Sequence, residues 1–328
     1  MDIKKLEDRV FAIKSLSDFN DLALQIFYFQ YKNNVVYQNF IDLLKIDIRK
    51  LKNYTEIPCL PVEFFKTHTI SSVPFEPEQV FFSSGSTSLI RSKSLVYSKS
   101  LYETSIYKTF CSFYGSPGEY IITALIPNNP AIQNSSLVYM LDFLIKRTKN
   151  PLSGFYFERE KKLLDIINNK QKTKIILFGI TYALLRFAEN NYFPPNELIV
   201  IETGGMKGQM KEITRNELHT KLVRKFNSPI HSEYSMAEIM SQSYSSRNGI
   251  YMAPPWMHVS IRDVYDPLSC VENGKSGGID IIDLANIYTC SFIATKDIGI
   301  LHDNSTFEVS GRFDYSDVRG CNLMQTSI

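Results

Sequence analysis

Residues 83–88, with the sequence SSGSTS, combine hydroxyl side chains with one glycine directly after an apolar run. Arg91 and Lys93 follow at once. Backbone N–H groups of such a loop can point at phosphate oxygens, hydroxyl groups add donors, and nearby cations offset the negative charge. The GxxxxGK(S/T) spacing of a Walker loop is absent. The segment therefore predicts one of two structures, a phosphate cradle or an ordinary polar turn.

Two later stretches carry groups that could contact a nucleotide. Gly204 and Gly205 in ETGGMKG follow an apolar run and allow close approach of the backbone to a ligand. In HSEYSMAE, Tyr234 offers a flat aromatic face and Glu238 offers a hard oxygen ligand for Mg²⁺. The alternatives are a plain strand-to-loop turn and the start of a surface helix with ordinary acidic residues.

The C-terminal part of the chain contains two more candidate stretches. Asp297 in ATKDIG lies between an apolar run and a glycine, where an acidic side chain can accept hydrogen bonds from a ribose diol. Arg312 and Arg319 flank two aspartates in GRFDYSDVRG, and Cys321 follows. A thiolate there is a good nucleophile if a neighbouring cation lowers its pKa. The alternatives are a turn-forming aspartate, a charged hairpin and a small apolar filler at Cys321.

The elements that must position these residues alternate between short apolar runs and amphipathic stretches. The runs predict buried strands at 79–83, 120–127, 174–180 and 197–202. The intervening stretches predict helices at 100–115, 135–148, 158–169 and 214–226. This alternation implies an α/β fold with a largely parallel sheet. Loops at the carboxyl ends of such strands are the usual place for ligands.

The two ends of the chain differ from this centre. Residues 1–50 read as helical, with an N-cap candidate at Ser17. After residue 250, short alternating runs with Gly, Asn and Asp turns predict a mainly β subdomain. We therefore expect a helical N-terminus and an α/β region over 1–250, and a β-rich subdomain over 251–328.

Composition excludes several classes of protein. The 328 residues are 44% hydrophobic and 21% charged with a net charge of +2, so we expect a packed core and no nucleic-acid-binding surface. No signal peptide and no apolar stretch of roughly 18 residues that could span a bilayer is visible. The cysteines are scattered without a CxxC pair, which indicates neither zinc nor a disulfide framework and favours the reducing cytoplasm. Those predicted to lie in the core are Cys59, Cys111, Cys270 and Cys290.

Taken in order, the motifs resemble those of the adenylate-forming superfamily of acyl-CoA synthetases and luciferases. SSGSTS is similar to its phosphate loop, YSMAE to Y-G-x-T-E, TKDIG to T-G-D-x-G, and GRFDYSDVRG to its hinge motif. Within the superfamily, ETGGMKGQMKEITRNELH, HSEYSMAEIMSQSYS and GRFDYSDVRGCNLM resemble the acyl-protein synthetase family of bacterial bioluminescence operons. The resemblance implies a fold like the N-terminal domain of adenylate-forming enzymes: parallel sheets with flanking helices and a smaller β subdomain. It implies that the small C-terminal domain bearing a lysine is absent.

The resemblance also implies an ATP- and Mg²⁺-dependent ligase that activates a carboxylic acid, with a fatty acid as the expected substrate. The carboxylate attacks the α-phosphorus to give acyl-AMP and pyrophosphate, and the acyl group then passes to a thiol, here that of Cys321. An acyl-CoA or acyl-protein reductase is the implied partner. The implied nucleotide-binding residues are Ser83, Ser84, Gly85, Ser86, Thr87, Gly204, Gly205, Tyr234, Asp297 and Arg312, and Glu238 is the implied Mg²⁺ ligand.

The sequence departs from the family pattern in two respects. Ser88 replaces the second glycine of the phosphate loop, which would stiffen the loop or narrow its fit. The lysine of the C-terminal domain has no counterpart, so Lys207, Arg91 or Lys93 is the candidate for the missing cation.

Two other functions stay open at this stage. A ligase of the same chemistry could pass the acyl group to coenzyme A or to an acyl carrier protein. A degenerate relative could bind a nucleotide or an acyl-AMP without turnover, in a surface lipid or polysaccharide pathway. The many aromatic residues, 22 Phe and 19 Tyr, fit either a fatty chain or an aryl ring in the substrate.

Overall fold

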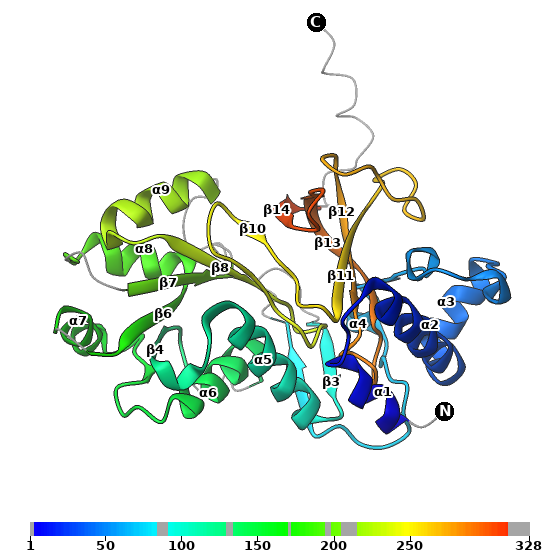
Figure 1. Ribbon diagram of the computed structural model, residues 1–328, viewed down its shortest axis with the longest axis horizontal. Coiled ribbons are helices and arrows are strands. Elements are labelled where there is room, and N and C mark those ends of the chain that lie inside the picture. The colour runs from blue at the N-terminus through cyan, green and yellow to red at the C-terminus, as the bar shows by residue number, and fades with distance from the viewer. Residues whose placement is uncertain are drawn as a thin grey trace, which may run out of the picture.

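Two six-stranded sheets organise the chain, and a two-stranded hairpin lies between them (Figure 1). The computed structural model describes residues 3–83, 91–128, 134–169, 172–193, 198–204 and 215–313. Among these residues, no helix combines the length and the apolar character that crossing a membrane requires.

The first sheet is parallel at its centre, as the sequence predicts. Its strand order is β5-β4-β6-β7-β8-β9, and only β9 runs antiparallel to its neighbour. The strands are β4 (Tyr120–Leu125), β5 (Gly154–Phe155), β6 (Lys174–Ile180), β7 (Leu198–Thr203), β8 (Ile230–Tyr234) and β9 (Ser243–Ser245). All six residues of β4 are buried, which is the burial expected of a strand covered on both faces.

Helices cover both faces of this sheet (Figure 1). They are α5 (Lys99–Tyr114), α6 (Ser136–Thr148), α7 (Glu160–Asn168), α8 (Thr181–Glu189) and α9 (Arg215–Phe226), and the 3₁₀ turn η3 (Pro117–Glu119) precedes β4. The helices predicted at 100–115, 135–148, 158–169 and 214–226 are confirmed as α5, α6, α7 and α9. Helix α8 was not predicted, since only Thr181 and Tyr182 separate the apolar run of β6 from the apolar residues of α8.

The second sheet is the mainly β region predicted after residue 250. Its order is β10-β14-β13-β12-β11, all antiparallel, and β1 adds a parallel pairing to β13. The strands are β1 (Leu60–Pro61), β10 (Ile250–Tyr251), β11 (Met257–Arg262), β12 (Ser276–Asp283), β13 (Phe292–Leu301) and β14 (Phe307–Arg312). Cys290, just before β13, is buried as predicted, whereas Cys270 is exposed and the prediction that it lies in the core is wrong.

N-terminal helices pack on this second sheet. They are α1 (Ile3–Val10), α2 (Leu16–Asn33), α3 (Val35–Leu43), η1 (Ile48–Lys50), η2 (Tyr54–Glu56) and α4 (Phe64–Thr67). The Phe27 ring of α2 meets the Phe292 ring edge-on at 6.1 Å, and the Tyr37 ring of α3 stacks on Phe292 at 6.0 Å. The helical reading of residues 1–50 is therefore confirmed, and these helices share one core with β13.

The predicted N-cap at Ser17 is wrong. The helix α2 begins at Leu16, so Ser17 already lies within its first turn. Ser15 has extended backbone angles, and its Oγ accepts a hydrogen bond from the Asp18 N–H at 3.1 Å. Two serines two positions apart offer the same capping chemistry, and the local pattern did not distinguish them.

The strand predicted at 79–83 is present but lies outside the parallel sheet. Residues Gln79–Phe82 form β2, which pairs antiparallel with β3 (Lys93–Val96) as a separate hairpin. An apolar run specifies a strand but not its partner, and the partner here is the segment on the other side of the SSGSTS loop. The hairpin thereby brings Ser83 beside Ser92.

Replacing Ser15 with Ala should lower the free energy of unfolding by about 1 kcal/mol, because the Asp18 N–H loses its capping acceptor. Urea denaturation of the whole chain measures this change. Ser17→Ala is the matched control and should stay within about 0.5 kcal/mol of the wild type. A larger loss for Ser17→Ala than for Ser15→Ala would contradict the cap assignment.

Candidate active site

The carboxyl ends of β7 and β8 carry the first two groups of the candidate site. Gly204 follows β7 directly and has a φ of 69°, a conformation that glycine adopts without steric cost. The Thr181 hydroxyl at the start of α8 donates to the Gly204 carbonyl at 2.6 Å, which fixes this turn. Tyr234 is the last residue of the neighbouring strand β8. The parallel sheet therefore presents both residues at the same edge.

Asp297 joins this edge from the second sheet. The Tyr234 hydroxyl donates to Asp297 Oδ2 at 2.8 Å, and Arg312 Nε lies 3.5 Å from Asp297 Oδ1. Asp297 and Arg312 are opposite one another across β13 and β14. Asp297 lies inside β13 rather than in a turn, so the turn-forming alternative is wrong. Three of the predicted site residues from distant parts of the sequence are thus in direct contact.

Aromatic rings hold Tyr234 in place. The Tyr251 and Phe307 rings each lie 5.8 Å from the Tyr234 ring, measured between centroids, and Tyr251 stacks on Phe307 at 5.4 Å. These rings come from β10 and β14, so the second sheet packs against the end of β8. The orientation of the Tyr234 ring is therefore set by the junction of the two sheets.

Glu238 connects the third motif to the first. The Ser92 hydroxyl donates to Glu238 Oε1. The Ser92 N–H donates in turn to Ser83 Oγ at 3.0 Å, and the Ser83 N–H donates to the Ser92 carbonyl at 3.1 Å. Glu238 is only 6% exposed. Ser92 therefore links Ser83 to Glu238, the candidate Mg²⁺ ligand, through hydrogen bonds.

Several predicted site residues fall outside the part of the chain that the structure describes. Apart from Ser83, these include the whole phosphate loop, the second glycine of the pair, the candidate lysine and the candidate nucleophile. They are Ser84, Gly85, Ser86, Thr87, Ser88, Gly205, Lys207 and Cys321.

Burial shapes the electrostatics of the two carboxyl groups. It raises the pKa of Glu238, and the hydrogen bond from Ser92 and the charge of Arg312 offset part of that rise. It also raises the pKa of Asp297, where the Tyr234 hydroxyl and Arg312 act in the opposite direction. The charge of Asp297 adds to the rise at Glu238, so the two carboxyl groups and Arg312 interact as one cluster. Such a cluster favours a cationic or hydrogen-bond-donating ligand.

The residues present fit a magnesium–nucleotide complex. Among the described residues, no three His, Cys, Asp or Glu side chains gather as a preformed metal cage. Mg²⁺ commonly binds one or two carboxylates together with substrate phosphates and keeps several waters. Glu238 supplies a buried hard oxygen of this kind, and the Ser92 hydroxyl is hydrogen-bonded to its Oε1.

Ser92 was not among the predicted site residues, although the sequence around it has a strand-like alternation. Arg91 and Lys93, on either side of Ser92, are exposed, whereas Ser92 and Ser94 are buried. This alternation has the period of a strand and places Ser92 on the inner face. The same alternation turns Lys93 outward, away from Glu238, so Lys93 is a poor candidate for the missing cation.

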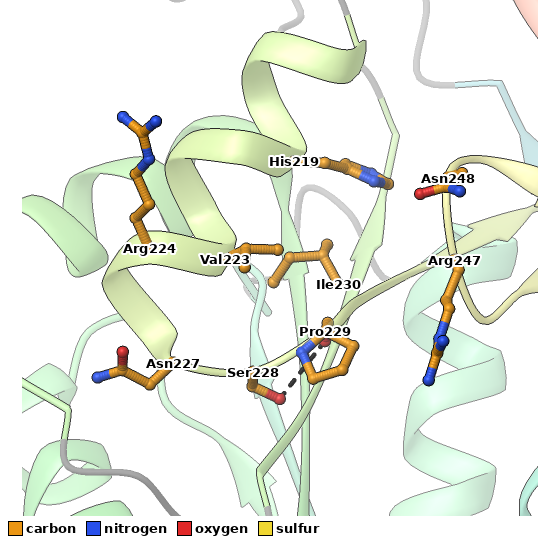
Figure 2. Close-up of a pocket in the computed structure, with 9 residues that line it drawn as sticks. All are labelled: His219, Val223, Arg224, Asn227, Ser228, Pro229, Ile230, Arg247 and Asn248. Carbon is orange, nitrogen blue, oxygen red and sulfur yellow. Dashed lines mark hydrogen bonds between the residues drawn. The ribbon is translucent and has the colours of Figure 1, made fainter.

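A hollow lies elsewhere, along α9 and the turn before β10 (Figure 2). It is an open groove of about 580 Å³. Val223, Pro229 and Ile230 form an apolar centre, and Figure 2 shows Arg224 and Arg247 directed away from one another on opposite sides. Arg224 and Arg247 do not converge on one point, and none of the described residues that line the groove is a predicted site residue, so we assign the site to the cluster around Asp297 and Glu238.

Comparison of the whole sequence with characterised proteins finds one relative of similar length. The long-chain-fatty-acid–luciferin-component ligase of Vibrio harveyi is 23% identical over 323 residues, which cover 90% of this chain and 84% of the relative. No family model matches the chain.

Solved structures share the fold. A 2-hydroxyisobutyryl-CoA ligase in complex with 2-HIB-AMP and CoA aligns with a TM-score of 0.70 at 12% identity, covering 91% of this chain and 71% of that chain. The O-succinylbenzoate coenzyme A synthetase of Bacillus subtilis, in complex with ATP and magnesium, aligns with a TM-score of 0.52 at 15% identity, covering 71% and 49%. ATP-bound MatB from Rhodopseudomonas palustris gives 0.54 at 12% identity, covering 71% and 47%.

These likenesses confirm the predicted α/β fold, which the chain shares with the 2-hydroxyisobutyryl-CoA ligase and MatB. The resemblance read from the motifs is also confirmed, since the relative found by sequence is a long-chain-fatty-acid–luciferin-component ligase. The chain spans about half of the length of the synthetase and of MatB.

Glu238→Gln tests the raised pKa of the buried carboxyl group. The folded carboxyl stays protonated at pH values where the unfolded carboxyl, with its ordinary value of 4.5, has ionised. Rising pH therefore favours the unfolded wild type. The variant has no carboxyl group at this position and does not lose stability in this way. Its free energy of unfolding, relative to that of the wild type, should therefore rise from about pH 4.5 upward by at most about 1.4 kcal/mol per pH unit, until the pH passes the pKa of the folded carboxyl group. Urea titrations without nucleotide or metal measure the difference, and a difference independent of pH would refute the raised pKa.

Proposed function

We propose that this protein activates a carboxylic acid with ATP and then transfers the acyl group to a thiol. The observation that carries the proposal is the convergence of Tyr234, Asp297, Arg312, Glu238 and Ser83 at the junction of the two sheets. These contacts link residues of four motifs that are far apart in the sequence, which supports an adenylate-forming site.

In this proposal the nucleotide lies between the two sheets. Tyr234 places its ring beside adenine, with Gly204 lining the approach at the end of β7. Asp297 accepts hydrogen bonds from the ribose hydroxyls, in exchange for part of its present contacts with Tyr234 and Arg312. Arg312, whose side chain is 70% exposed, is free to turn toward the ribose or the phosphates.

The phosphate end of the nucleotide faces the SSGSTS loop. Residues 83–87 hold the β and γ phosphates through backbone and hydroxyl donors. Glu238 holds Mg²⁺, which when bound neutralises charge on the phosphate oxygens. Ser92 keeps the Glu238 carboxyl in a fixed orientation through its hydrogen bond. Lys207 remains the candidate for a cation close to the α-phosphate.

The proposed reaction has two chemical steps. A carboxylate oxygen of the acid attacks the α-phosphorus, the bond to the β-phosphate oxygen breaks, and pyrophosphate leaves. The Cys321 thiolate then attacks the acyl carbonyl, and AMP leaves with the electron pair of the broken C–O bond. Cys321 thereby becomes a thioester, which makes the protein a carbon–sulfur-bond-forming ligase.

The substrate and partners are part of the proposal. The fatty-acid name of the Vibrio harveyi relative supports a long-chain acid. A reductase that accepts the acyl group from the thioester is the partner whose chemistry fits this product, and the reaction is placed in the cytoplasm. Transfer to coenzyme A or to a carrier protein is the alternative for the second step, supported by the CoA bound in the 2-hydroxyisobutyryl-CoA ligase.

Pyrophosphate exchange into ATP tests the first step directly. With Mg²⁺ and a panel of short, long and aryl acids, at least one acid should support exchange. Asp297→Asn should raise the KM for ATP about tenfold, equivalent to a loss of about 1.4 kcal/mol, because an anionic acceptor for the ribose is lost. ATP binding without exchange for any acid would contradict the proposal and would favour the non-catalytic alternative.

Cys321→Ser separates the two steps. With ATP, Mg²⁺ and a radiolabelled acid, the wild type should become labelled through a bond that hydroxylamine cleaves. Cys321→Ser should lose this label and keep pyrophosphate exchange. Cys270→Ser, which removes a cysteine that is exposed, is the matched control and should retain both activities. Retention of the label by Cys321→Ser, or label on added coenzyme A, would assign the acceptor elsewhere.

A further inference from the structure

Glu238 lies in a segment that has no regular secondary structure. The segment runs from the end of β8 at Tyr234 to the start of β9 at Ser243, and it contains neither helix nor strand. A carboxylate on such a segment keeps its position only through the contacts that anchor the backbone. A misplacement of about 1 Å can cost a catalytic site a hundredfold in rate.

Asp283, the last residue of β12, anchors this segment just beyond Glu238. Its Oδ2 accepts hydrogen bonds from the Met240 N–H at 2.7 Å and the Ser241 N–H at 2.9 Å. Its Oδ1 accepts from the Ser241 hydroxyl at 2.7 Å and from the Ala285 N–H at 3.1 Å. Asp283 is fully buried, and burial raises its pKa while these donors offset part of the rise. One carboxyl group is thus bonded to two consecutive backbone N–H groups of the segment.

Asn286 anchors Glu238 itself. Its Nδ2 donates to the Glu238 carbonyl at 2.8 Å and to the Cys290 carbonyl at 2.8 Å. Its Oδ1 accepts a hydrogen bond from the Thr289 hydroxyl. The side chain of Asn286 is completely buried. The backbone of Glu238 is therefore tied to the connection between β12 and β13.

The helix α2 holds this connection from the other side. Gln30 Nε2 donates to the Asn286 carbonyl at 3.0 Å and to the Ile287 carbonyl at 2.8 Å, and Gln30 Oε1 accepts from the Ser291 N–H at 2.9 Å. Gln30 is completely buried, as expected of an amide whose donors and acceptor are used. The chain of contacts therefore runs from the N-terminal helices to Glu238.

We propose that Asp283 and Asn286 are positioning residues for the Glu238 carboxylate, and that α2 contributes to this positioning through Gln30. The inference rests on the proposed function only for the ligand that Glu238 holds. It assigns a role in the active site to the N-terminal helices. These residues act through Glu238 and do not themselves contact the substrate.

A purely structural role would give a different result. Loss of any buried hydrogen bond lowers stability, so thermal unfolding alone does not distinguish the two roles. Residues that orient a metal ligand typically change metal affinity or activity 10- to 100-fold when they are replaced. Metal affinity at a temperature where the fold is intact is therefore the informative readout.

The test uses the full chain and measures Mn²⁺ binding in the presence of ATP by electron paramagnetic resonance. Asp283→Asn should weaken Mn²⁺ binding at least tenfold and accelerate hydrogen exchange at the Met240 and Ser241 amides. Gln30→Leu should weaken Mn²⁺ binding less than Asp283→Asn does, but more than twofold. Ser241→Ala removes one hydroxyl contact of Asp283, and gives a milder variant if Asp283→Asn does not fold.

Thr123→Val is the control. It removes a buried hydroxyl hydrogen bond to the Ile176 carbonyl within the first sheet, and should lower the melting temperature without changing Mn²⁺ affinity by more than twofold. Equal Mn²⁺ affinity in Asp283→Asn, Ser241→Ala and the wild type would overturn the inference while leaving the proposed function intact. Failure of the wild type to bind Mn²⁺ with ATP would instead overturn the proposed function, and the inference with it.

Discussion

The site depends on the polar contacts that join the two sheets. Tyr234 and Glu238 belong to the first sheet and the segment that follows it, whereas Asp297 and Arg312 belong to the second. The Tyr234–Asp297 hydrogen bond crosses this junction. Buried polar groups cost free energy unless they are paired, so the arrangement is stable only when both sheets are folded and in register. The site is therefore a property of the complete junction, and neither sheet contains it alone.

Burial of carboxyl groups gives this junction its chemical character. Glu238 and Asp297 both have a raised pKa, mainly because each is removed from water, and the charge of Asp297 adds to the rise at Glu238. Arg312 offsets only part of the rise in pKa of these carboxyl groups, since its side chain is largely exposed. A ligand that carries a divalent cation and hydroxyl donors would stabilise the ionised form of both carboxyl groups at once. A magnesium-bound nucleotide, the ligand we propose, has this combination of groups.

Much of the fold could be predicted from local pattern, because the buried strands 120–125, 174–180 and 198–203 are continuous apolar runs. Tyr234, Glu238 and Asp297 could be predicted as candidates because their motifs have a recognisable order. The pairing of β2 with β3 could not, since an apolar run does not specify its partner. Asp283 at the end of an apolar strand reads like any solvent-facing aspartate. Its role depends on a segment some 40 residues earlier, and no local periodicity encodes such a contact.

The proposed function requires an acyl-adenylate to bind beside Tyr234 and Asp297. A crystal structure of the full chain with a non-hydrolysable acyl sulfamoyl adenosine would test it most directly. The account predicts adenine beside the Tyr234 ring and both ribose hydroxyls within hydrogen-bond distance of Asp297. An analogue bound elsewhere, for example in the groove along α9, with Tyr234 and Asp297 still bonded only to each other and to Arg312, would contradict it.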